Sequence, residues 1–224
     1  MEYFTFNNVS SETLGVLMQD EFLDSTPAIS FEEIDIPGRD GAVIEIQNLK
    51  NVLMDIKCTL RDSANRDAVR RWLHGTGDFI FNGRKRRAFI LGQIDFQRIG
   101  TEMEAFTLSV IFEPFWYPES DELTSIGSAA GTYTVTNTGT VASVPIISIT
   151  GTGTITLSIN GTSVQITAGD TEVTLIIDSK SKTLTPTGIA NLGWRYPTLN
   201  PGSNEITVTG SITDISIGRK DRWF

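Results

Sequence analysis

The sequence predicts a mainly β protein of two domains, a β structure with one α-helix over residues 1–120 and an antiparallel β-sandwich over residues 121–224. Three observations support this prediction. Apolar residues alternate with polar ones in a series of short segments, one segment alone has helical spacing, and composition and charge change near residue 120. The 20 glycines and 8 prolines fit a chain with many turns.

Strands in the first domain are predicted where apolar residues follow a period of two, because successive side chains of a strand point to opposite faces. The clearest strand runs from Val52 to Leu60 and has Cys58 on its apolar face, so this thiol is a predicted core residue. Further strands are expected at Phe4–Phe6, at Ile29–Ile36 despite the acidic pair Glu32 and Glu33, at Ile44–Ile46, at Ile94–Phe96 and at Phe106–Phe112.

One helix is expected directly after Leu60. Asp62 or Ser63 can cap its first amides, and Gly75 can take the left-handed conformation beyond its end. Apolar residues at helical spacing form one stripe, which is expected to lie across a sheet. The stripe consists of Ala64, Ala68, Val69, Trp72 and Leu73.

A β-hairpin and a proline-containing seam complete the first domain. Asn82-Gly83 tolerates the positive φ angles of a type I′ turn and joins Phe79–Phe81 to Ala88–Leu91. Two prolines in the segment Glu113–Pro118 prevent a β-ladder from continuing. The seam therefore marks the domain boundary near residue 120.

The second domain is rich in Thr, Ser and Gly, and its apolar residues alternate without helical spacing. Turn signals between the apolar runs are Asn160-Gly161, Gly169-Asp170 and Pro201-Gly202. Short strands at this spacing favour an antiparallel sandwich of about 100 residues. The runs are Ile155–Ile159, Val164–Ile166, Val173–Ile177, Ile206–Val208 and Ile215–Ile217.

The net charge lies entirely in the first domain. Residues 1–124 hold 12 basic and 21 acidic residues, a balance of −9, whereas residues 125–224 hold 6 of each. An acidic domain repels polyanions, so no tight nucleic-acid site is expected despite the basic run Arg84–Arg87. No apolar run approaches the roughly 18 residues of a membrane span. The N-terminus lacks the basic and apolar regions of a secretory signal, so the chain is expected in a cytoplasm.

No catalytic site, metal site or cofactor is expected. His74 is the single histidine, and its place at the end of the predicted helix favours a capping role. The chain has no CxxC pair and no glycine-rich nucleotide-binding motif. Carboxylates are numerous in the first domain, but sequence cannot place two of them as an acid and base pair. The protein is therefore expected not to be an enzyme.

Two aromatic segments are candidate contact sites. Trp194, Arg195 and Tyr196 lie between strands, where a ring can stack on a sugar, anchor a protein partner or pack on its own domain. The C-terminal segment Arg219–Phe224 is basic and aromatic. It is expected either to dock on the acidic first domain or a neighbouring molecule, or to fray into solvent.

Three short motifs then occur in order along the chain. They are Ile36–Gly41, which contains the turn Gly38, Arg39, Asp40 and Gly41; the seam Phe112–Tyr117; and Leu199–Ile206, followed later by Arg222-Trp223. With these motifs, its length and its fold class, the whole sequence resembles the distal tail proteins (Dit) of siphophages that infect mainly Gram-positive bacteria.

The resemblance implies an N-terminal, β-barrel-like belt domain (residues 1–120) that forms a homohexameric ring continuing the tail tube. It implies a galectin-like sandwich (residues 121–224) outside this ring. The implied partners are other copies of the chain, the major tail tube protein, and a tail-tip lysin or receptor-binding protein. The implied location is the virion, after assembly in the host cytoplasm, and an acidic ring suits the passage of DNA because it binds phosphate weakly.

Two other functions stay open at this point. The alternative is a carbohydrate-binding module for host cell-wall polysaccharide, through Trp194 and Tyr196. A galectin sugar site usually includes a histidine, however, and residues 125–224 contain none. A tail-tip hydrolase is the third hypothesis, and the sequence offers it no nucleophile.

Overall fold

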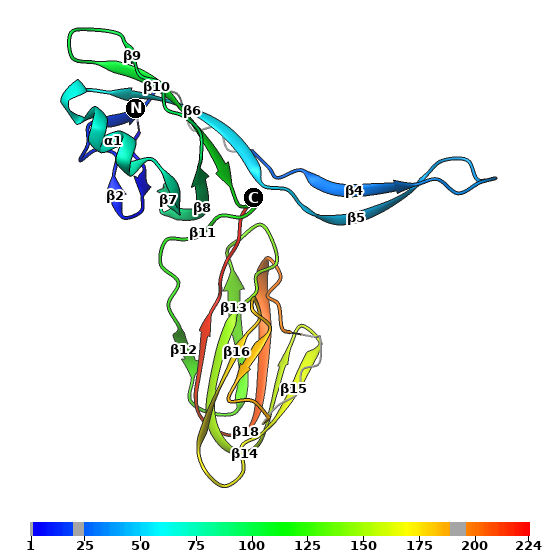
Figure 1. The fold of residues 1–224 in the computed structure, drawn as a ribbon. Helices are drawn as coiled ribbons and strands as arrows, with labels where there is room; N and C mark the ends of the chain where they lie inside the picture. The colour runs from blue at the N-terminus through cyan, green and yellow to red at the C-terminus, as the bar shows by residue number, and fades with distance from the viewer. Residues whose placement is uncertain (1, 20–24, 189–195) are drawn as a thin grey trace. The chain divides into compact units, whose positions relative to one another are not determined.

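The computed structural model describes residues 2–19, 25–188 and 196–224. The chain divides into two compact units (Figure 1). Unit 1 is Met1–Glu119 together with Phe224, and unit 2 is Ser120–Trp223. Both consist mainly of antiparallel strands, so the prediction of a mainly β fold is confirmed.

Unit 1 contains a nine-stranded sheet with the order β2-β1-β7-β8-β10-β6-β3, in which β11 also pairs with β8 and β9 with β10. A separate hairpin, β4–β5, projects away from this sheet (Figure 1). The elements are β1 (Thr5–Phe6), β2 (Val9–Ser10), β3 (Val16–Met18), β4 (Ile29–Ile34), β5 (Val43–Leu49), β6 (Val52–Leu60), η1 (Ser63–Asn65), α1 (Arg66–Trp72), β7 (Gly75–Phe81), β8 (Arg84–Ile90), β9 (Gln97–Arg98), β10 (Glu104–Phe112) and β11 (Tyr117–Pro118).

The core of unit 1 follows the alternation of its central strands. β10 pairs with β6 over its full length, from Glu104 opposite Leu60 to Phe112 opposite Val52. Each fully buried apolar side chain contributes about 1.5–3 kcal/mol. The buried apolar residues of these two strands are Val52, Ile56, Cys58, Leu60, Phe106, Leu108, Val110 and Phe112.

The predicted ends of the helix are confirmed in outline. The carboxylate of Asp62 accepts a hydrogen bond from the amide of Ala64 at 2.9 Å. This bond caps the 3₁₀ turn η1, which leads directly into α1. Gly75 has a φ of +89°, in the left-handed region that favours glycine, and begins β7.

The apolar stripe predicted for the helix is narrower than expected. Val69 and Leu73 are buried, and Trp72 is half-buried with its ring stacked on Phe4 at 5.5 Å. Ala64 and Ala68 are exposed, so the prediction for these two residues was wrong. A helix of seven residues has only two turns, and the face that it turns to the sheet is complete without them.

The expected strand at Ile94–Phe96 does not form. Both side chains are half-buried in an irregular segment, and the short strand β9 begins only at Gln97. The ring of Phe96 packs against Phe106 at 4.8 Å. Two apolar residues that alternate can therefore line a loop that lies over a core, as well as a strand.

The turn and the seam of unit 1 lie where the sequence predicts them. Asn82 and Gly83 have φ angles of +49° and +70°, as a type I′ turn requires, and they join β7 to β8. β10 ends at Phe112, before the two prolines. Pairing resumes briefly, however, because Tyr117 lies opposite Lys85 of β8.

A buried arginine holds the seam against β8. Arg86 is 0% exposed, and its guanidinium donates to the carbonyls of Glu113 and Pro114, the latter at 3.0 Å. The same guanidinium lies 5.4 Å from the ring of Phe112 and 5.3 Å from that of Trp116. A buried cation needs such partners because it has lost its water.

In unit 2, two long strands run through both layers of the sandwich. The first part of β14 pairs with β16 and with the C-terminal part of β18, and its second part pairs with β15 and the N-terminal part of β18. The elements are β12 (Thr124–Gly127), β13 (Gly131–Asn137), β14 (Ile146–Ile159), β15 (Thr162–Thr167), β16 (Val173–Asp178), β17 (Thr183–Thr185) and β18 (Gly202–Gly218).

A glycine corner explains why sequence reasoning divided β18 into two strands. The register between β14 and β18 shifts around Gly151 and Thr154, where the strands bend. Gly210 has a φ of +105°, and a Cβ there would lie 2.4 Å from the carbonyl oxygen of Thr154. Ile206–Val208 and Ile215–Ile217 therefore belong to one strand that changes layer, as strands do at sandwich corners.

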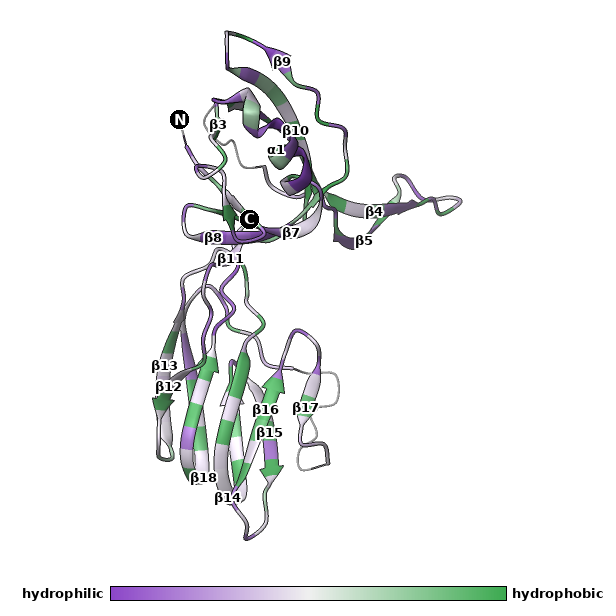
Figure 2. Ribbon diagram, turned by 60° about the vertical axis from the view of Figure 1, so that its left-hand side comes forward, coloured by the Kyte–Doolittle hydropathy of each residue, from purple (hydrophilic) through white to green (hydrophobic). Residues whose placement is uncertain are grey.

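The core of unit 2 has the predicted alternation, which is visible as bands along β14 and β18 in Figure 2. The prediction of an antiparallel sandwich is confirmed. The strands β12 and β13 were missed because they contain few apolar residues. The core residues are Val135, Ile147, Ile149, Ile155, Leu157, Ile159, Val164, Ile166, Leu175, Ile177, Leu199, Ile206, Val208, Ile212, Ile215 and Ile217.

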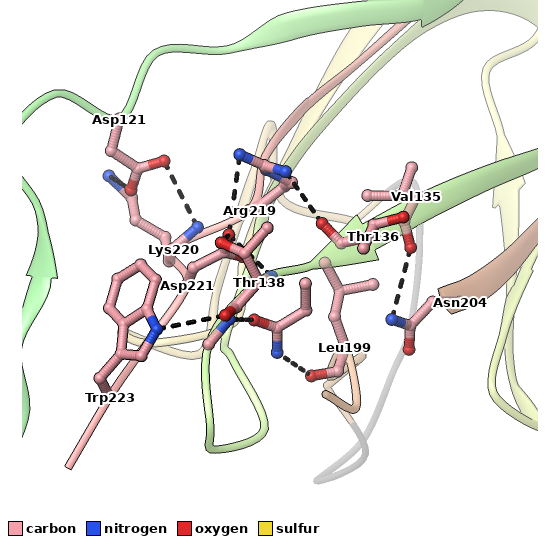
Figure 3. A network of polar contacts seen from close by, with 12 residues as sticks. Asp121, Val135, Thr136, Thr138, Leu199, Asn204, Arg219, Lys220, Asp221 and Trp223 are labelled. Atoms are coloured by element: carbon pink, nitrogen blue, oxygen red, sulfur yellow. Dashed lines mark hydrogen bonds and ion pairs between the residues drawn. The ribbon is translucent and has the colours of Figure 1, made fainter. Parts of the chain in front are cut away.

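Buried amides close one end of this sandwich (Figure 3). Asn204 is 2% exposed and donates to the carbonyls of Asn200 and Gly202 at 2.8 and 2.9 Å. Its carbonyl oxygen accepts from the amide of Asn200 at 2.8 Å and from the side chain of Asn160 at 2.7 Å. Asn137 donates to the carbonyl of Leu199 at 2.9 Å. We call Asn137 and Asn204, with Asp221 described below, the closing network.

The C-terminal segment is part of unit 2 up to Trp223. Asp221 is 2% exposed and accepts from the amide and hydroxyl of Thr138 at 3.1 and 2.7 Å. The indole of Trp223 donates to the carbonyl of Thr138 at 3.2 Å, and Lys220 lies 2.8 Å from Asp121 (Figure 3). The expectation of a frayed segment was therefore wrong for these residues.

Candidate assembly surface

The hairpin β4–β5 is the strongest candidate for a functional surface. In the described part of the chain its two strands pair only with each other. Phe31 lies opposite Ile46, and Ile44 lies one step further along the same face. Four large apolar side chains on this face are more than half exposed: Ile29 at 51%, Phe31 at 54%, Ile44 at 61% and Ile46 at 69%. We call these four residues the apolar stripe.

The exposure of the apolar stripe is unfavourable for an isolated molecule. Full burial of one such side chain is worth about 1.5–3 kcal/mol, and a lone two-stranded hairpin is at best marginally stable in water. Contiguous exposed apolar surface on a folded protein commonly marks an interaction site. We therefore expect a second molecule to bind the hairpin and cover the apolar stripe.

The opposite face of the hairpin carries two facing carboxylates, and Glu33 lies opposite Ile44 at the edge of the apolar stripe. Glu32 lies directly opposite Glu45, an arrangement of like charges that destabilises an isolated pair of strands. The side-chain amide of Gln47 donates to Glu32 at 3.2 Å. Over residues 29–49, Glu32, Glu33, Asp35, Asp40 and Glu45 stand against Arg39 alone, a balance of −4. The hairpin thus combines an apolar face with a negative field.

The four residues singled out as a family turn form the tip of this hairpin. The amide of Arg39 donates to the carbonyl of Ile36 at 3.1 Å across Pro37 and Gly38, and Gly38 has a φ of +82°. A type II turn requires this glycine at its third position and favours proline at its second. Gly41 follows with a φ of +79°, and Arg39 and Asp40 between the glycines are exposed.

Of the three candidate sugar-binding residues, only Tyr196 lies within the described part of the chain. Trp194 and Arg195 lie outside the described residues. Tyr196 is half-buried against the core of unit 2, and its hydroxyl donates to the carbonyl of Lys182 at 2.7 Å. The aromatic ring of Tyr196 therefore takes part in the packing of its own domain.

The described residues contain no candidate metal site. Among residues 2–19, 25–188 and 196–224, no group of three or more His, Cys, Asp and Glu side chains could hold a metal ion. Burial raises the pKa of the Cys58 thiol to about 12, so it is a core residue and not a nucleophile. His74 is exposed, and its side chain makes no hydrogen bond with the residues that the structure describes. No helix among these residues is long and apolar enough to cross a bilayer.

Sequence reasoning found the strands of the hairpin but missed their exposure. Period-two alternation is typical of a strand with one buried face, and it does not reveal whether the same molecule buries that face. The signal that was present is the acidic pair Glu32 and Glu33 inside an apolar strand. Because an unpaired charge is costly to bury, these two residues and Glu45 argue against burial of both hairpin faces in one core.

Comparisons with known proteins find a similar fold among solved structures but no match in sequence. No protein-family model matches the chain, and no curated protein matches its sequence. In fold, the chain is similar to the crystal structure of the SPP1 Dit protein (gp 19.1), with a TM-score of 0.72, 14% sequence identity and coverage of 99% of both chains. That protein is described as a paradigm of the hub adsorption apparatus in phages that infect Gram-positive bacteria.

Two structures of the phage P2 baseplate in its activated conformation are also similar. The one with Ca has a TM-score of 0.42 and 8% identity, and it covers 96% of both chains. The one with Sr has a TM-score of 0.39 and 7% identity, and it covers 96% of this chain and 97% of the other. The Dit fold predicted from three short motifs is confirmed by the first of the three comparisons.

Proposed function

We propose that this protein is a structural hub of a phage tail tip, in which six copies form a ring through unit 1. The observation that carries the proposal is the apolar stripe, on a hairpin that the fold of its own unit leaves uncovered. The similarity of the whole chain to a Dit hub protein supports the same conclusion.

A ring of identical subunits closes through one repeated head-to-tail contact, which uses two different surfaces of each chain. The apolar stripe is one of these surfaces and packs on the next copy. Obligate interfaces of this kind typically bury more than about 2,000 Å². Four large apolar side chains at the centre of the contact fit the composition of such interfaces.

The two domains have different tasks in this proposal. Residues 1–120 form the belt that continues the tail tube, and residues 121–224 form a galectin-like sandwich outside the ring. The partners are the major tail tube protein and a tail-tip lysin or receptor-binding protein. The protein belongs to the virion, is assembled in the host cytoplasm, and has no enzymatic activity.

The charge of the chain is consistent with a ring that DNA crosses. The formal net charge is −9 at pH 7. A negative surface does not retain DNA. Binding to DNA is driven by counterions that are released when lysine and arginine neutralise its phosphates. The ring therefore allows DNA to pass without a specific grip on it.

Multi-angle light scattering and negative-stain imaging of the purified full-length protein test the proposal. We expect ring particles with the mass of six chains and a central opening. The double variant F31S/I46S is expected to abolish them, while I176S, which changes an exposed isoleucine of unit 2, leaves them intact. A wild-type chain that stays monomeric at high concentration, with and without a tail-tip partner, contradicts the proposed function.

A further inference from the structure

A pocket lies at the end of α1 in unit 1. Its volume is about 320 Å³, at the lower end of the roughly 300–1,000 Å³ range of binding pockets. One wall is the C-terminal end of α1, and the other is the loop that follows β8. The lining residues are Arg70, Leu73, His74, Gly92, Gln93, Ile94 and Asp95, and we call this site the helix-end pocket.

The helix-end pocket carries charges of both signs in fixed positions. The guanidinium of Arg70 lies 5.3 Å from the centre of the Phe96 ring, which positions it at the pocket wall. Its nearest carboxylate, on Asp67, is 3.7 Å away, and both side chains are more than half exposed, so this ion pair is weak. On the loop, Asp95 accepts a hydrogen bond from Gln93 at 2.6 Å.

The hairpin tip carries the same two charges as neighbours in sequence. Arg39 and Asp40 lie between two glycines with positive φ, so the turn presents both side chains outward. Both are exposed, and neither forms an ion pair within the described part of the chain. A turn that is already ordered loses little conformational freedom when a partner binds it.

We propose that the hairpin tip of one copy inserts into the helix-end pocket of the next, with Asp40 paired to Arg70 and Arg39 paired to Asp95. This inference rests on the proposed function and names the second surface that a head-to-tail ring requires. Charge complementarity of both signs fixes the register of the contact and disfavours the reverse orientation.

The positions of the two surfaces within unit 1 support this contact. Figure 1 shows the hairpin β4–β5 pointing away from the side of unit 1 that carries α1. A chain with its tip on one side and the matching pocket on the other can repeat the contact from copy to copy. If the two surfaces lay side by side, the same charges would favour contact within one chain.

Charge exchange between tip and pocket tests the proposal. The measurement is the concentration at which half of the full-length chain is assembled, obtained by mass photometry or sedimentation. We expect D40R and R70D each to raise this concentration by roughly tenfold or more, because each places like charges in contact. The double variant D40R/R70D is expected to return to within about threefold of the wild type. R39D, D95R and their combination form an independent second pair.

Matched variants control for general effects of charge. R71D changes the next residue of α1, which is exposed and does not line the pocket, and E205R changes an exposed glutamate of unit 2. Both are expected to assemble as the wild type does. If the wild type forms rings but neither reversal weakens them, or if no double variant restores them, the tip–pocket contact is wrong and the ring function stands. A monomeric wild type overturns both.

A crosslink gives a readout that does not depend on affinity. Paired cysteines in the variant D40C/Q93C are expected to join neighbouring copies as a ladder of disulfide-linked chains under mild oxidation. The native thiol does not interfere, since Cys58 is buried and its pKa is raised to about 12. D40C alone is expected to give no ladder, and the absence of a ladder from assembled D40C/Q93C rings contradicts the proposal.

Discussion

The hairpin of unit 1 and the closing network of unit 2 depart from the ordinary distribution of residues in opposite ways. The hairpin places Phe31 and Ile46 in solvent, at 54% and 69% exposure. The closing network places Asn204 and Asp221 in the interior, each at 2% exposure. One region has apolar groups outside, and the other has polar groups inside.

The difference lies in where the partners are found. Asn204 finds hydrogen-bond partners in its own domain, on Asn160, Asn200 and Gly202, so its burial is complete within one molecule. The apolar stripe finds no cover among the described residues of unit 1 and needs another molecule. Substitutions in the closing network are therefore expected to change folding, and substitutions in the stripe are expected to change assembly.

Among substitutions of buried polar residues, the largest expected effect on stability follows from Asn204→Leu. The leucine fills a similar space but leaves the carbonyls of Asn200 and Gly202 and the amide of Asn200 without these hydrogen bonds. We expect the free energy of unfolding of unit 2 to fall by about 3–5 kcal/mol. Hydrogen exchange of the β13 and β18 amides, measured in increasing urea, reports this loss separately from unit 1.

The matched control for this prediction is Asn48→Ala. Asn48 is an exposed asparagine of the hairpin, and its loss is expected to change the free energy of unfolding by less than about 0.5 kcal/mol. If both substitutions lowered the free energy of unfolding equally, the closing network would be no more important for folding than the hairpin.

A second and smaller effect is expected at Arg86, a fully buried polar side chain of unit 1. Arg86→Met leaves the carbonyls of Glu113 and Pro114 without their donor, and we expect a loss of about 2–3 kcal/mol in the urea unfolding of unit 1. Arg86→Lys keeps the charge but not the planar fork, so it is expected to lose about half as much. If Arg86→Lys is as stable as the wild type, the planar guanidinium group is not needed for the stability of unit 1.

The third effect is a dependence on acid. The hydrogen bond from Arg66 holds the pKa of Glu104 below its ordinary value of 4.5. A carboxylate with a lowered pKa in the folded state stabilises that state above its ordinary pKa, and this contribution is lost as the pH falls through the folded value. The urea midpoint of unit 1 is therefore expected to fall as the pH is lowered below the ordinary pKa of 4.5.

Glu104→Gln separates this pair from other acid effects. The glutamine cannot titrate, so the variant is expected to be less stable than the wild type at pH 7 and to lose less stability on acidification. Unfolding curves at several pH values measure both slopes. If the two proteins lose stability in parallel, the acid sensitivity of unit 1 comes from other carboxylates.

The contrast between the two regions also explains what the sequence could predict. Alternation located β6, β10 and the cores of both units, because in these strands one molecule buries the apolar face. The turn at Asn82-Gly83 was predictable because positive φ angles have a strong residue preference, whereas the turn at Gly38–Gly41 was identified through the family resemblance. Local chemistry therefore determined most of the strands and turns.

Long-range partners were beyond sequence reasoning. The role of Asn204 depends on Asn160 and Asn200, which only the fold brings together. The helix-end pocket joins Arg70 to a loop that sequence reasoning interpreted as a strand at Ile94–Phe96. The exposure of the apolar stripe could not be predicted either, since alternation has the same form whether its own chain or another covers the strand.

The smallest effect on folding is expected where the effect on assembly is largest. Phe31→Ser with Ile46→Ser should leave the free energy of unfolding within about 0.5 kcal/mol of the wild type, because the two side chains are already in solvent. Ile56→Ser makes the same type of change on β6, the next strand along the chain, at a site that is 6% exposed, and is expected to lower the free energy of unfolding by about 3–5 kcal/mol. Urea unfolding at protein concentrations too low for assembly measures both changes.

If the hairpin variant loses more than about 1 kcal/mol in its free energy of unfolding, the apolar stripe stabilises its own fold, since surface substitutions usually stay within half that value. If the hairpin variant keeps its free energy of unfolding but no longer forms rings, the apolar stripe acts in the contact between copies.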